Sequence, residues 1–439
     1  MRLIYNILFS VFLCLSAPFY FLKMWRRGNW RPGFSERFGK YDSKVKQALT
    51  NRHTLWLHAV SMGEVNICTH LIQALEPRLP NAKLVVSTTT STGMGELRKR
   101  LPSHVQRIYY PIDRRPWVAR ALGTIHPEAV ILVEAEIWPN FLWRCAELGI
   151  PVFLINARLS ERSYRGYRRW GWLFRPLFAN LAGVGCQNEA DAERLADLGC
   201  RRESIRVLGS LKFDSVKLDE RRVLDVPALL DQLGVSKTGL VLVCGSTHAG
   251  EEAVLGAIYL RLKKQFPSLF LVIVPRHAER SKTAAQELMD LGLCVVFRTE
   301  ITERTESNPG SVDCVVVNTT GELRYFYERA DVIFVGKSLT AHGGQNPIEP
   351  GAMGKAMVFG PNMENFPQIA PAFVSERGAL QVKDARELES AFERLLKDDA
   401  LRADLGANAL RVVQKNQGAM QRTVEMILGQ LEHSETHIC

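Results

Sequence analysis

The chain opens with an apolar run. Residues 3–22 (LIYNILFSVFLCLSAPFYFL) contain no charged side chain, and about 20 such residues are enough for a helix to cross the hydrocarbon core of a bilayer. A cleavable signal peptide would have a shorter apolar region and small residues at its end, whereas this run ends in FYFL. The pattern predicts an uncleaved membrane anchor over residues 1–25.

Basic residues follow the run. Only Arg2 precedes it, whereas the positions after it include Lys23, Arg26, Arg27, Arg31 and Arg37. Because positively charged flanks stay on the cytoplasmic side, the rest of the chain is expected in the cytoplasm. A hydrophobic hairpin lying on the membrane, which Asn6 and Pro18 would favour, is the alternative. The anchor is thus single-pass or monotopic.

After about residue 50, short apolar runs rich in β-branched residues alternate with amphipathic stretches, which is typical of a parallel α/β sheet. The first six runs are 54–60, 83–87, 129–133, 152–156, 183–187 and 205–208. A polar stretch follows around 215–226, and six more runs lie at 240–246, 269–274, 294–297, 314–318, 332–335 and 356–359. The pattern predicts two doubly wound, Rossmann-like domains, 30–218 and 223–420.

Length and composition agree with two globular domains. A chain of 439 residues exceeds what one core usually organises, and it is 46% hydrophobic and 23% charged. The net charge of +10 favours an anionic partner such as phospholipid, nucleic acid or a phosphorylated substrate. The 9 cysteines lie far apart with no CxxC pair, which disfavours a zinc ribbon or disulfide scaffold and indicates a reducing compartment.

In doubly wound sheets the ligand sits at the carboxyl ends of the strands, so the segments after each run are expected to face a cleft between the domains. The first is HAVSMGE, 58–64. Glu64 is expected in the first turn of the next helix, where the partial positive charge of the helix N-terminus favours a carboxylate able to take a proton from a sugar hydroxyl. The alternative is a capping box with Ser61.

The segment VEAEIWPN, 133–140, places two carboxylates at a strand end. Glu134 and Glu136 would share a face only if the strand continued through both. Neighbouring carboxylates at a strand end need a cationic or hydroxyl partner, which favours substrate contact, with N-capping of the next helix as the alternative. The segment GSLKFD, 209–214, places Lys212 beside the expected cleft.

The segment NARLSERSYRGYRR, 156–169, clusters arginines among tyrosines. Guanidinium groups bind phosphate oxygens in a bidentate manner, so an anionic lipid head group is the favoured partner. RNA and a solvated helix face are the alternatives. The candidate acceptor-binding residues are Arg158, Arg162 and Arg165.

In the second domain the strand ends carry GSTHAGEE, VPRH, NTTGEL and GGQNPIEPG. In the last segment Gly343 and Gly344 would let backbone approach a phosphate, Pro347 suits the first helical position, and Glu349 would accept hydrogen bonds from ribose hydroxyls. The histidines lack metal-ligand spacing, so no metal site is expected. There is no GxGxxG or Walker A motif to indicate dinucleotide or P-loop chemistry.

Nine segments, taken in order after the apolar run, resemble the bacterial Kdo (3-deoxy-D-manno-octulosonic acid) transferases that act on lipid A. They are HAVSMGE, STTTSTG, YYPIDRRP, EAEIWPN, NARLSERSY, GSLKFD, VPRH, TTGEL and GGQNPIEPG. The resemblance implies the GT-B glycosyltransferase fold, with acceptor bound by the first domain and CMP-Kdo by the second. It also implies Glu64 as general base, and Glu134 and Lys212 as supports of the transition state. The expected donor-binding residues are Pro275, Arg276, Thr320, Gly321, Glu322, Gly343, Gly344, Asn346, Pro347, Ile348 and Glu349.

The activity that this resemblance implies is an inverting transfer of Kdo from CMP-Kdo to a lipid A precursor. It would occur at the cytoplasmic face of a bacterial inner membrane rich in anionic lipid, with no cofactor and no nucleic acid. Three positions depart from the family pattern: Ala135, Lys337 and Gln345. The open alternatives are another GT-B enzyme, either a UDP-sugar transferase or an epimerase, and a catalytically silent, membrane-tethered nucleotide-sugar binding module.

Overall fold

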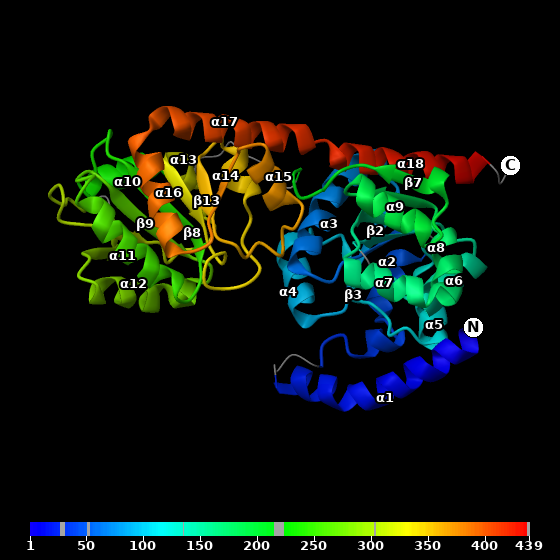
Figure 1. Ribbon diagram of the computed structural model, residues 1–439. Coiled ribbons are helices and arrows are strands. Elements are labelled where there is room, and N and C mark those ends of the chain that lie inside the picture. The colour runs from blue at the N-terminus through cyan, green and yellow to red at the C-terminus, as the bar shows by residue number, and fades with distance from the viewer. Residues whose placement is uncertain (27–30, 51–52, 135, 215–223, 303, 437–439) are drawn as a thin grey trace. The chain divides into compact units, whose positions relative to one another are not determined.

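The chain folds into two compact units (Figure 1). A computed structural model describes residues 1–26, 31–50, 53–134, 136–214, 224–302 and 304–436. The N-terminal unit comprises Met1–Ser215 together with Gln417–Cys439, and the C-terminal unit comprises Val216–Asn416. The last helix of the chain therefore belongs to the unit in which the chain begins.

The N-terminal unit is built on a parallel sheet of seven strands in the order β3-β2-β1-β4-β5-β6-β7. Its strands are β1 His53–His58, β2 Ala82–Thr88, β3 Gln106–Tyr109, β4 Ala129–Val133, β5 Val152–Ala157, β6 Gly183–Cys186 and β7 Ile205–Val207. Its helices are α1 Arg2–Arg26, α2 Ser43–Leu49, α3 Met62–Leu75, α4 Ser91–Arg100, α5 Arg115–Ile125, α6 Pro139–Glu147, α7 Glu161–Arg169, α8 Gly171–Ala179, α9 Glu189–Asp197 and α18 Ala419–Thr436.

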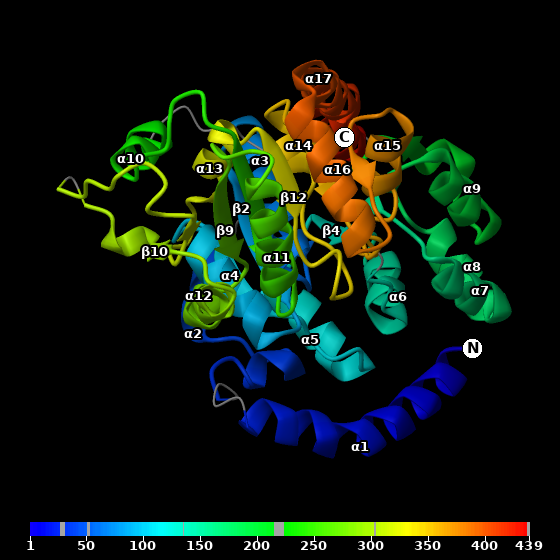
Figure 2. The same cartoon turned by 60° about the vertical axis from the view of Figure 1, so that its left-hand side comes forward.

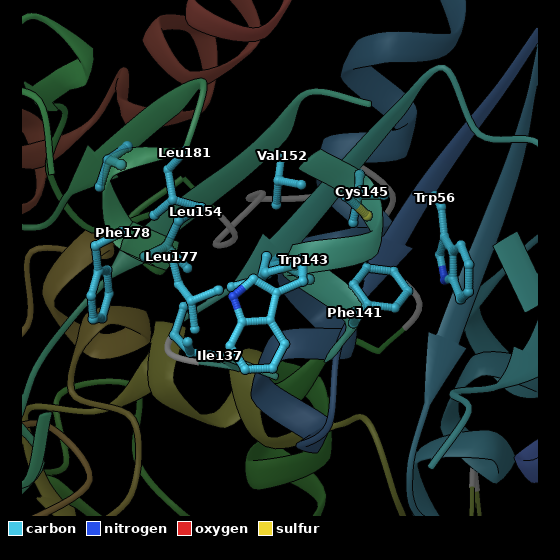
Figure 3. Packing of buried hydrophobic residues seen from close by; sticks show 14 of the residues in the cluster. Trp56, Ile137, Phe141, Trp143, Cys145, Val152, Leu154, Leu177, Phe178 and Leu181 are labelled. Atoms are coloured by element: carbon cyan, nitrogen blue, oxygen red, sulfur yellow. The ribbon is translucent and has the colours of Figure 1, made fainter. Parts of the chain in front are cut away.

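Both faces of this sheet are covered, because alternate strand residues point to opposite sides. In β1, Trp56 packs into one core cluster while Leu55 and Leu57 pack into the other. The first cluster includes Phe141 of α6, which packs edge-on against Trp56 with ring centroids 5.1 Å apart, and Phe178 of α8, which lies at the opposite side of the view in Figure 3. The second cluster includes side chains of α3 and, from the far end of the chain, Val424, Met426 and Ile427 of α18.

The C-terminal unit repeats this plan with a parallel sheet in the order β10-β11-β9-β8-β12-β13-β14. Its strands are β8 Val241–Thr247, β9 Phe270–Pro275, β10 Val295–Phe297, β11 Cys314–Val316, β12 Val332–Val335, β13 Met357–Phe359 and β14 Leu380–Gln381. Its helices are α10 Val226–Gln232, α11 Glu251–Lys263, α12 Ser281–Asp290, α13 Leu323–Arg329, α14 Ile348–Ala352, α15 Ile369–Ser375, α16 Ala385–Lys397 and α17 Asp399–Asn416.

The predicted apolar run forms one helix. α1 continues through Pro18 without a break, so the hairpin alternative is wrong. Within the described residues, α1 is the helix that is long and apolar enough to cross a membrane. In Figures 1 and 2 it runs along one side of the N-terminal unit.

Each of the twelve runs expected as strands contains a strand, with ends that differ by a few residues. Two strands were not expected, β3 and β14, and both lie at sheet edges. The two α/β units have the topology predicted for doubly wound domains.

Candidate functional site

The two segments expected to carry catalytic carboxylates meet at the centre of the N-terminal sheet. β1 and β4 are hydrogen-bonded neighbours, although β2 and β3 lie between them in the sequence. The chain therefore reverses its direction of travel across the sheet between β1 and β4, which is where doubly wound proteins bind ligands. Glu64 follows β1 and Glu134 follows β4.

Glu64 lies in the first turn of α3 and is 8% exposed. Ser61 caps this helix, because its Oγ accepts the Glu64 backbone N–H at 3.3 Å. The Glu64 carboxylate accepts the N–H of Val60 at 2.8 Å, whereas a capping box would use the N–H of Ser61 itself. Ser61 therefore caps the helix, but Glu64 does not complete a capping box. Glu64 also lines a cavity of about 180 Å³.

Burial raises the pKa of Glu64 above its usual range, and the nearby carboxylates of Glu134 and Glu136 raise it further. The hydrogen bonds from Val60 and Ser61 oppose this effect and are the smaller influence. The sequence predicted that the helix N-terminus favours the ionised form of Glu64, and in the structure burial outweighs the hydrogen bonds at this helix end. A carboxylate with a raised pKa is a stronger base.

Glu134 and Glu136 line the same cavity as Glu64 even though β4 ends at Val133. Glu134 adopts a left-handed backbone conformation (φ 63°), which interrupts the extended backbone directly after β4. Glu136 accepts a hydrogen bond from the Trp138 indole at 2.9 Å. A turn, and not a continued strand, brings the two carboxylates together.

N-capping of α6 by Glu134 or Glu136 is wrong. The first backbone N–H groups of this helix, from Asn140 and Phe141, donate to the buried carboxylate of Asp113 at 3.0 and 2.9 Å. The carboxylates after β4 are therefore not used to satisfy the helix.

Lys212 supplies a cation beside these carboxylates. Its Nζ lies 4.0 Å from Glu134 Oε1. Leu211 and Phe213 on either side are 0% and 3% exposed, so they fix the short segment in the core. The backbone N–H of Leu211 donates to Asn156 Oδ1 at 3.1 Å, which ties the segment to β5. Burial lowers the pKa of Lys212 below its usual value. The charge of Arg158 lowers it further, and the carboxylates of Glu134 and Glu64 oppose this without reversing it.

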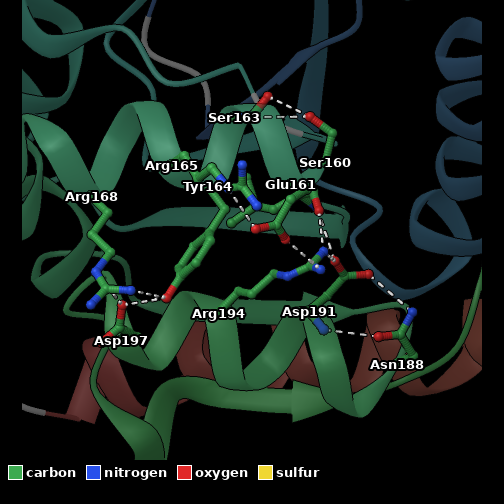
Figure 4. Close-up of polar contacts among 11 residues, drawn as sticks. Ser160, Glu161, Ser163, Tyr164, Arg165, Arg168, Asn188, Asp191, Arg194 and Asp197 are labelled. Atoms are coloured by element: carbon green, nitrogen blue, oxygen red, sulfur yellow. Dashed lines mark hydrogen bonds and ion pairs between the residues drawn. The ribbon is translucent and has the colours of Figure 1, made fainter.

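The arginine-rich segment forms α7, which is linked to α9 by polar contacts (Figure 4). Arg165 pairs with Glu161 at 2.9 Å, and Glu161 also pairs with Arg194 of α9 at 3.0 Å. The solvated-face alternative therefore describes Arg165. Arg158 lines the Glu64 cavity, and among the described residues Arg158 and Arg162 make no ion pair.

In the C-terminal unit the equivalent central position lies between β8 and β12. Here the buried Glu251 carboxylate accepts four backbone N–H groups at 2.8 to 3.0 Å, from His248, Lys337, Ser338 and Leu339. One side chain thus fixes the loops that follow both strands.

The expected donor residues lie at or after the ends of three parallel strands of this sheet, β9, β11 and β12. Pro275 ends β9, and Arg276 after it is exposed. Glu349 lies in the first turn of α14, where burial raises its pKa and the Asn346 amide and the charges of Arg276 and Arg324 oppose that rise.

Gly343 and Gly344 both have left-handed φ angles, of 116° and 70°. Their N–H groups already donate within the protein, to Glu364 at 2.7 Å and to the Lys337 carbonyl at 2.9 Å. Both N–H groups are therefore already used within the protein. If this backbone approaches a phosphate as expected, these two N–H groups are not free to bind it.

The other donor candidates lie around these segments. Pro347 is the residue before the first turn of α14, one position earlier than expected, and Ile348 is 0% exposed. Thr320 and Gly321 precede α13, and Glu322 accepts a hydrogen bond from Thr319 at 2.7 Å and pairs with Arg298 at 3.1 Å.

Comparison with known proteins identifies the family. Residues 32–215 match the family described as 3-deoxy-D-manno-octulosonic-acid transferase (kdotransferase). A 3-deoxy-D-manno-octulosonic acid transferase of Bordetella pertussis is 32% identical over 431 residues, which cover 94% of this chain and 96% of the relative. The chain belongs to the Kdo transferase family. A relative of the same description from Haemophilus influenzae is 29% identical over 92% of this chain and 93% of its own length.

This Kdo transferase family member is therefore a glycosyltransferase. Among solved structures, UDP-GlcNAc 2-epimerase from Neisseria meningitidis matches with a TM-score of 0.56 at 14% identity, over 86% of this chain and 100% of that one. At this identity the match shows the fold alone, which is the GT-B type.

The cavity of the transferase brings Glu64, Glu134 and Arg158 together, with Lys212 beside Glu134, whereas Arg162 and Arg165 lie on α7, outside the cavity lining. Glu136, for which the sequence favoured substrate contact without a specific role, also lines the cavity, as do Ser160 and Ser163, for which the sequence predicted no role. The signal for Glu136 was its spacing of two from Glu134. Behind it lies His58, which is fully buried, has its Nε2 3.9 Å from Glu136 Oε2, and has its pKa lowered by burial to about 3.

Proposed function

We propose that this glycosyltransferase moves Kdo from CMP-Kdo to a lipid A precursor, as a step of lipopolysaccharide biosynthesis at the bacterial inner membrane. The observation that carries the proposal is the convergence of Glu64, Glu134 and Lys212 where β1 and β4 meet, in a chain that belongs to the Kdo transferase family. This set contains a buried base and an adjacent cation–carboxylate pair.

Glu64 is the general base. It takes the proton of the acceptor's primary hydroxyl while the oxygen attacks the anomeric carbon of Kdo. The bond from that carbon to the CMP phosphate breaks, and CMP leaves with the electron pair. Because no glycosyl-enzyme forms, the configuration at the anomeric carbon inverts.

Glu134 and Lys212 support the transition state. Departure of CMP gives Kdo oxocarbenium character, and a carboxylate near this carbon is favourable for it. Lys212 holds Glu134 in place and offers positive charge to the phosphate, which becomes more negative as it departs. The partly buried environment of both side chains strengthens these interactions.

In the C-terminal unit, Arg276 binds the CMP phosphate and Glu349 accepts hydrogen bonds from the ribose. Support comes from their positions, after β9 and in the first turn of α14, and from the electrostatic coupling of the two side chains. A guanidinium suits phosphate oxygens, and a carboxylate suits a pair of ribose hydroxyls.

A transfer assay tests this function. The purified chain is incubated with CMP-Kdo and a lipid A precursor, and the lipid is weighed by mass spectrometry. The expected result is a mass increase by whole Kdo units that requires both substrates. CMP-Kdo turnover without a change in lipid mass would show that the acceptor is wrong, and transfer from a UDP-sugar in its place would show that the donor is wrong.

A further inference from the structure

The first turns of α1 are attached to the N-terminal unit by polar contacts. The Tyr5 hydroxyl donates to Asp113 Oδ2 at 2.7 Å. The amides of Asn6 and Asn140 exchange two hydrogen bonds, at 3.2 and 2.9 Å. Arg2 forms an ion pair with Glu147, the last residue of α6.

These contacts are connected to the core of the unit. Asp113 is 1% exposed and already accepts the first N–H groups of α6, so Tyr5 completes the set of donors around a buried carboxylate. The Tyr5 ring also packs edge-on against Trp143, with centroids 5.7 Å apart. A buried carboxylate that loses a donor is destabilised, which favours the attached state of α1.

The other end of α1 is also held against this unit. Phe21 contacts Phe34, with ring centroids 6.3 Å apart. Phe34 contacts Phe38 at 5.3 Å, and Phe38 packs on Trp117 of α5 at 4.8 Å. Close to these rings, the Arg37 guanidinium donates to the Thr89 carbonyl at 2.6 Å.

Contacts at both ends are incompatible with a crossing. A helix of 25 residues is about 37 Å long, and a helix that crosses a hydrocarbon core of about 30 Å has its two ends on opposite sides of the membrane. Among the described residues α1 is the helix that is long and apolar enough to cross, so the rest of the N-terminal unit would lie on one side and could reach only one end of a crossing helix.

Six of the exposed apolar side chains of α1 form an outer apolar row. Its members recur every three or four positions, as expected for one side of a helix, and are 43% to 78% exposed: Ile4, Leu8, Val11, Leu15, Phe19 and Leu22. The partly buried positions away from this row include Tyr5, Asn6, Phe9, Leu13 and Ser16. An exposed apolar row of this length is unfavourable in water.

We propose that α1 lies in the plane of the membrane surface, with its outer apolar row among the acyl chains and its first residue on the cytoplasmic side. The occupant of the row is a lipid monolayer rather than another protein, because basic residues, Arg26 and Arg31, adjoin its end and match anionic head groups. The inference rests on the proposed action at a membrane and adds that the chain does not cross it.

Protease protection of a tagged chain tests the proposal. The full-length chain carries one epitope tag before Met1 and a different tag after Cys439, and protease is added to spheroplasts. An in-plane α1 leaves both tags intact until lysis, whereas a crossing α1 loses only the first tag. Loss of the first tag from intact spheroplasts would overturn the proposal.

Cross-linking in native membranes provides a second measurement. In a Cys14→Ser background, Asn6→Cys with Asn140→Cys should be joined by a short bismaleimide, because the two side chains are in hydrogen-bond contact. The matched control, Leu15→Cys with Asn140→Cys, places one thiol in the outer apolar row and should not be joined. Equal cross-linking of both pairs, or of neither, would contradict the docked helix.

Pelleting and protease protection together distinguish a failure of the proposed action at a membrane from a failure of the in-plane position of α1. If the chain stays in the supernatant when membranes are pelleted, action at a membrane is wrong. If it pellets but loses its first tag, only the in-plane position of α1 is wrong.

Discussion

The Glu64 carboxylate could serve as a base or as part of a helix cap, and two substitutions separate these roles. Glu64→Gln keeps the hydrogen bond to Val60 but cannot take a proton, so transfer should fall by about 100- to 10,000-fold. Ser61→Ala removes the cap of the same helix and should cost about 0.5–2 kcal/mol of stability with transfer largely retained. Initial rates of Kdo transfer and denaturant unfolding measure the two effects.

Intrinsic fluorescence gives a clean stability readout for both variants, because all 8 tryptophans of the chain lie in the N-terminal unit. Near-normal transfer by Glu64→Gln would remove Glu64 from the mechanism. A large loss of transfer in Ser61→Ala, at unchanged stability, would point to a role of Ser61 itself.

The raised pKa of Glu64 predicts a pH dependence of both activity and stability. Transfer should decline as the pH falls through this raised pKa, because the base becomes protonated. The native state favours the protonated form, so this stabilising contribution is complete below the ordinary pKa of 4.5 and is lost as the pH rises through the folded-state value. Glu64→Gln should therefore be at least as stable as the natural chain at neutral pH, and pH-dependent unfolding measures this. If the unfolding free energy changed equally with pH in the natural chain and in Glu64→Gln, the raised pKa of Glu64 would be contradicted.

Arg276 and Glu349 are expected to act on the donor alone. Arg276→Ala and Glu349→Gln should each weaken CMP binding about tenfold to a hundredfold, because each removes a charged hydrogen-bond partner. Arg261→Ala is the matched control, since Arg261 forms an exposed ion pair with Glu389 in the same unit. Calorimetry with CMP, beside a separate lipid-binding assay, distinguishes the cases. Normal CMP binding with loss of the lipid would reverse the assignment of the two units.

The residues around Glu64 show which features of the site could be predicted from the sequence and which could not. Strand ends and motif order were sufficient to bring Glu64, Glu134 and Lys212 into one place. The left-handed conformation of Glu134 was not predictable, because glutamate rarely adopts it. The use of the Gly343 N–H by Glu364 was also hidden, since the pair lies 21 positions apart in the sequence.

At the scale of an element, the loop before α14 depends on close packing at Gly344. A methyl group there would lie 2.4 Å from Met363 Sδ and would also require a left-handed φ of 70°. Gly292→Ala is the matched control, with φ 90° and open space around it. Gly344→Ala should lower the unfolding free energy by about 1–3 kcal/mol more than the control does, because only the methyl group added at position 344 crowds its neighbours. Far-ultraviolet circular dichroism with denaturant measures this, and equal losses would show that crowding plays no part.

The elements that sequence patterns missed share a physical cause. β3 is a four-residue edge strand, QRIY, in which only the last two side chains are buried, so its apolar run is too short to stand out. β14 has two residues and depends on its neighbour β13 for its hydrogen bonds. Central strands such as β4 are buried throughout, and their continuous apolar runs made them predictable.

At the scale of the molecule, the last helix of the chain, α18, packs into the N-terminal unit. The Asp214 carboxylate accepts the N–H groups of Gly418 and Met420, each at 2.7 Å. Val424, Met426 and Ile427 are at most 2% exposed. Burial of each such side chain contributes about 1.5–3 kcal/mol, so the three together amount to a large part of a typical domain stability of about 5–15 kcal/mol.

A chain that ends at Asn416 should therefore fail to form a stable N-terminal unit while its C-terminal unit still binds CMP. Tryptophan fluorescence reports the first outcome and calorimetry the second. A chain that ends at Glu432 keeps these contacts and is the control. A normal unfolding transition in the shorter chain would show that α18 is dispensable.

The return of α18 also determines when the N-terminal unit can mature during protein synthesis. Roughly 200 residues of the other unit are translated between Ser215 and Gln417, which takes roughly 10–40 s at about 5–20 residues per second. Throughout this interval the apolar surface that α18 will cover is open on the nascent chain. The half of the enzyme that carries Glu64 is thus made first but completed last, and during that interval it is exposed to aggregation or to capture by a chaperone.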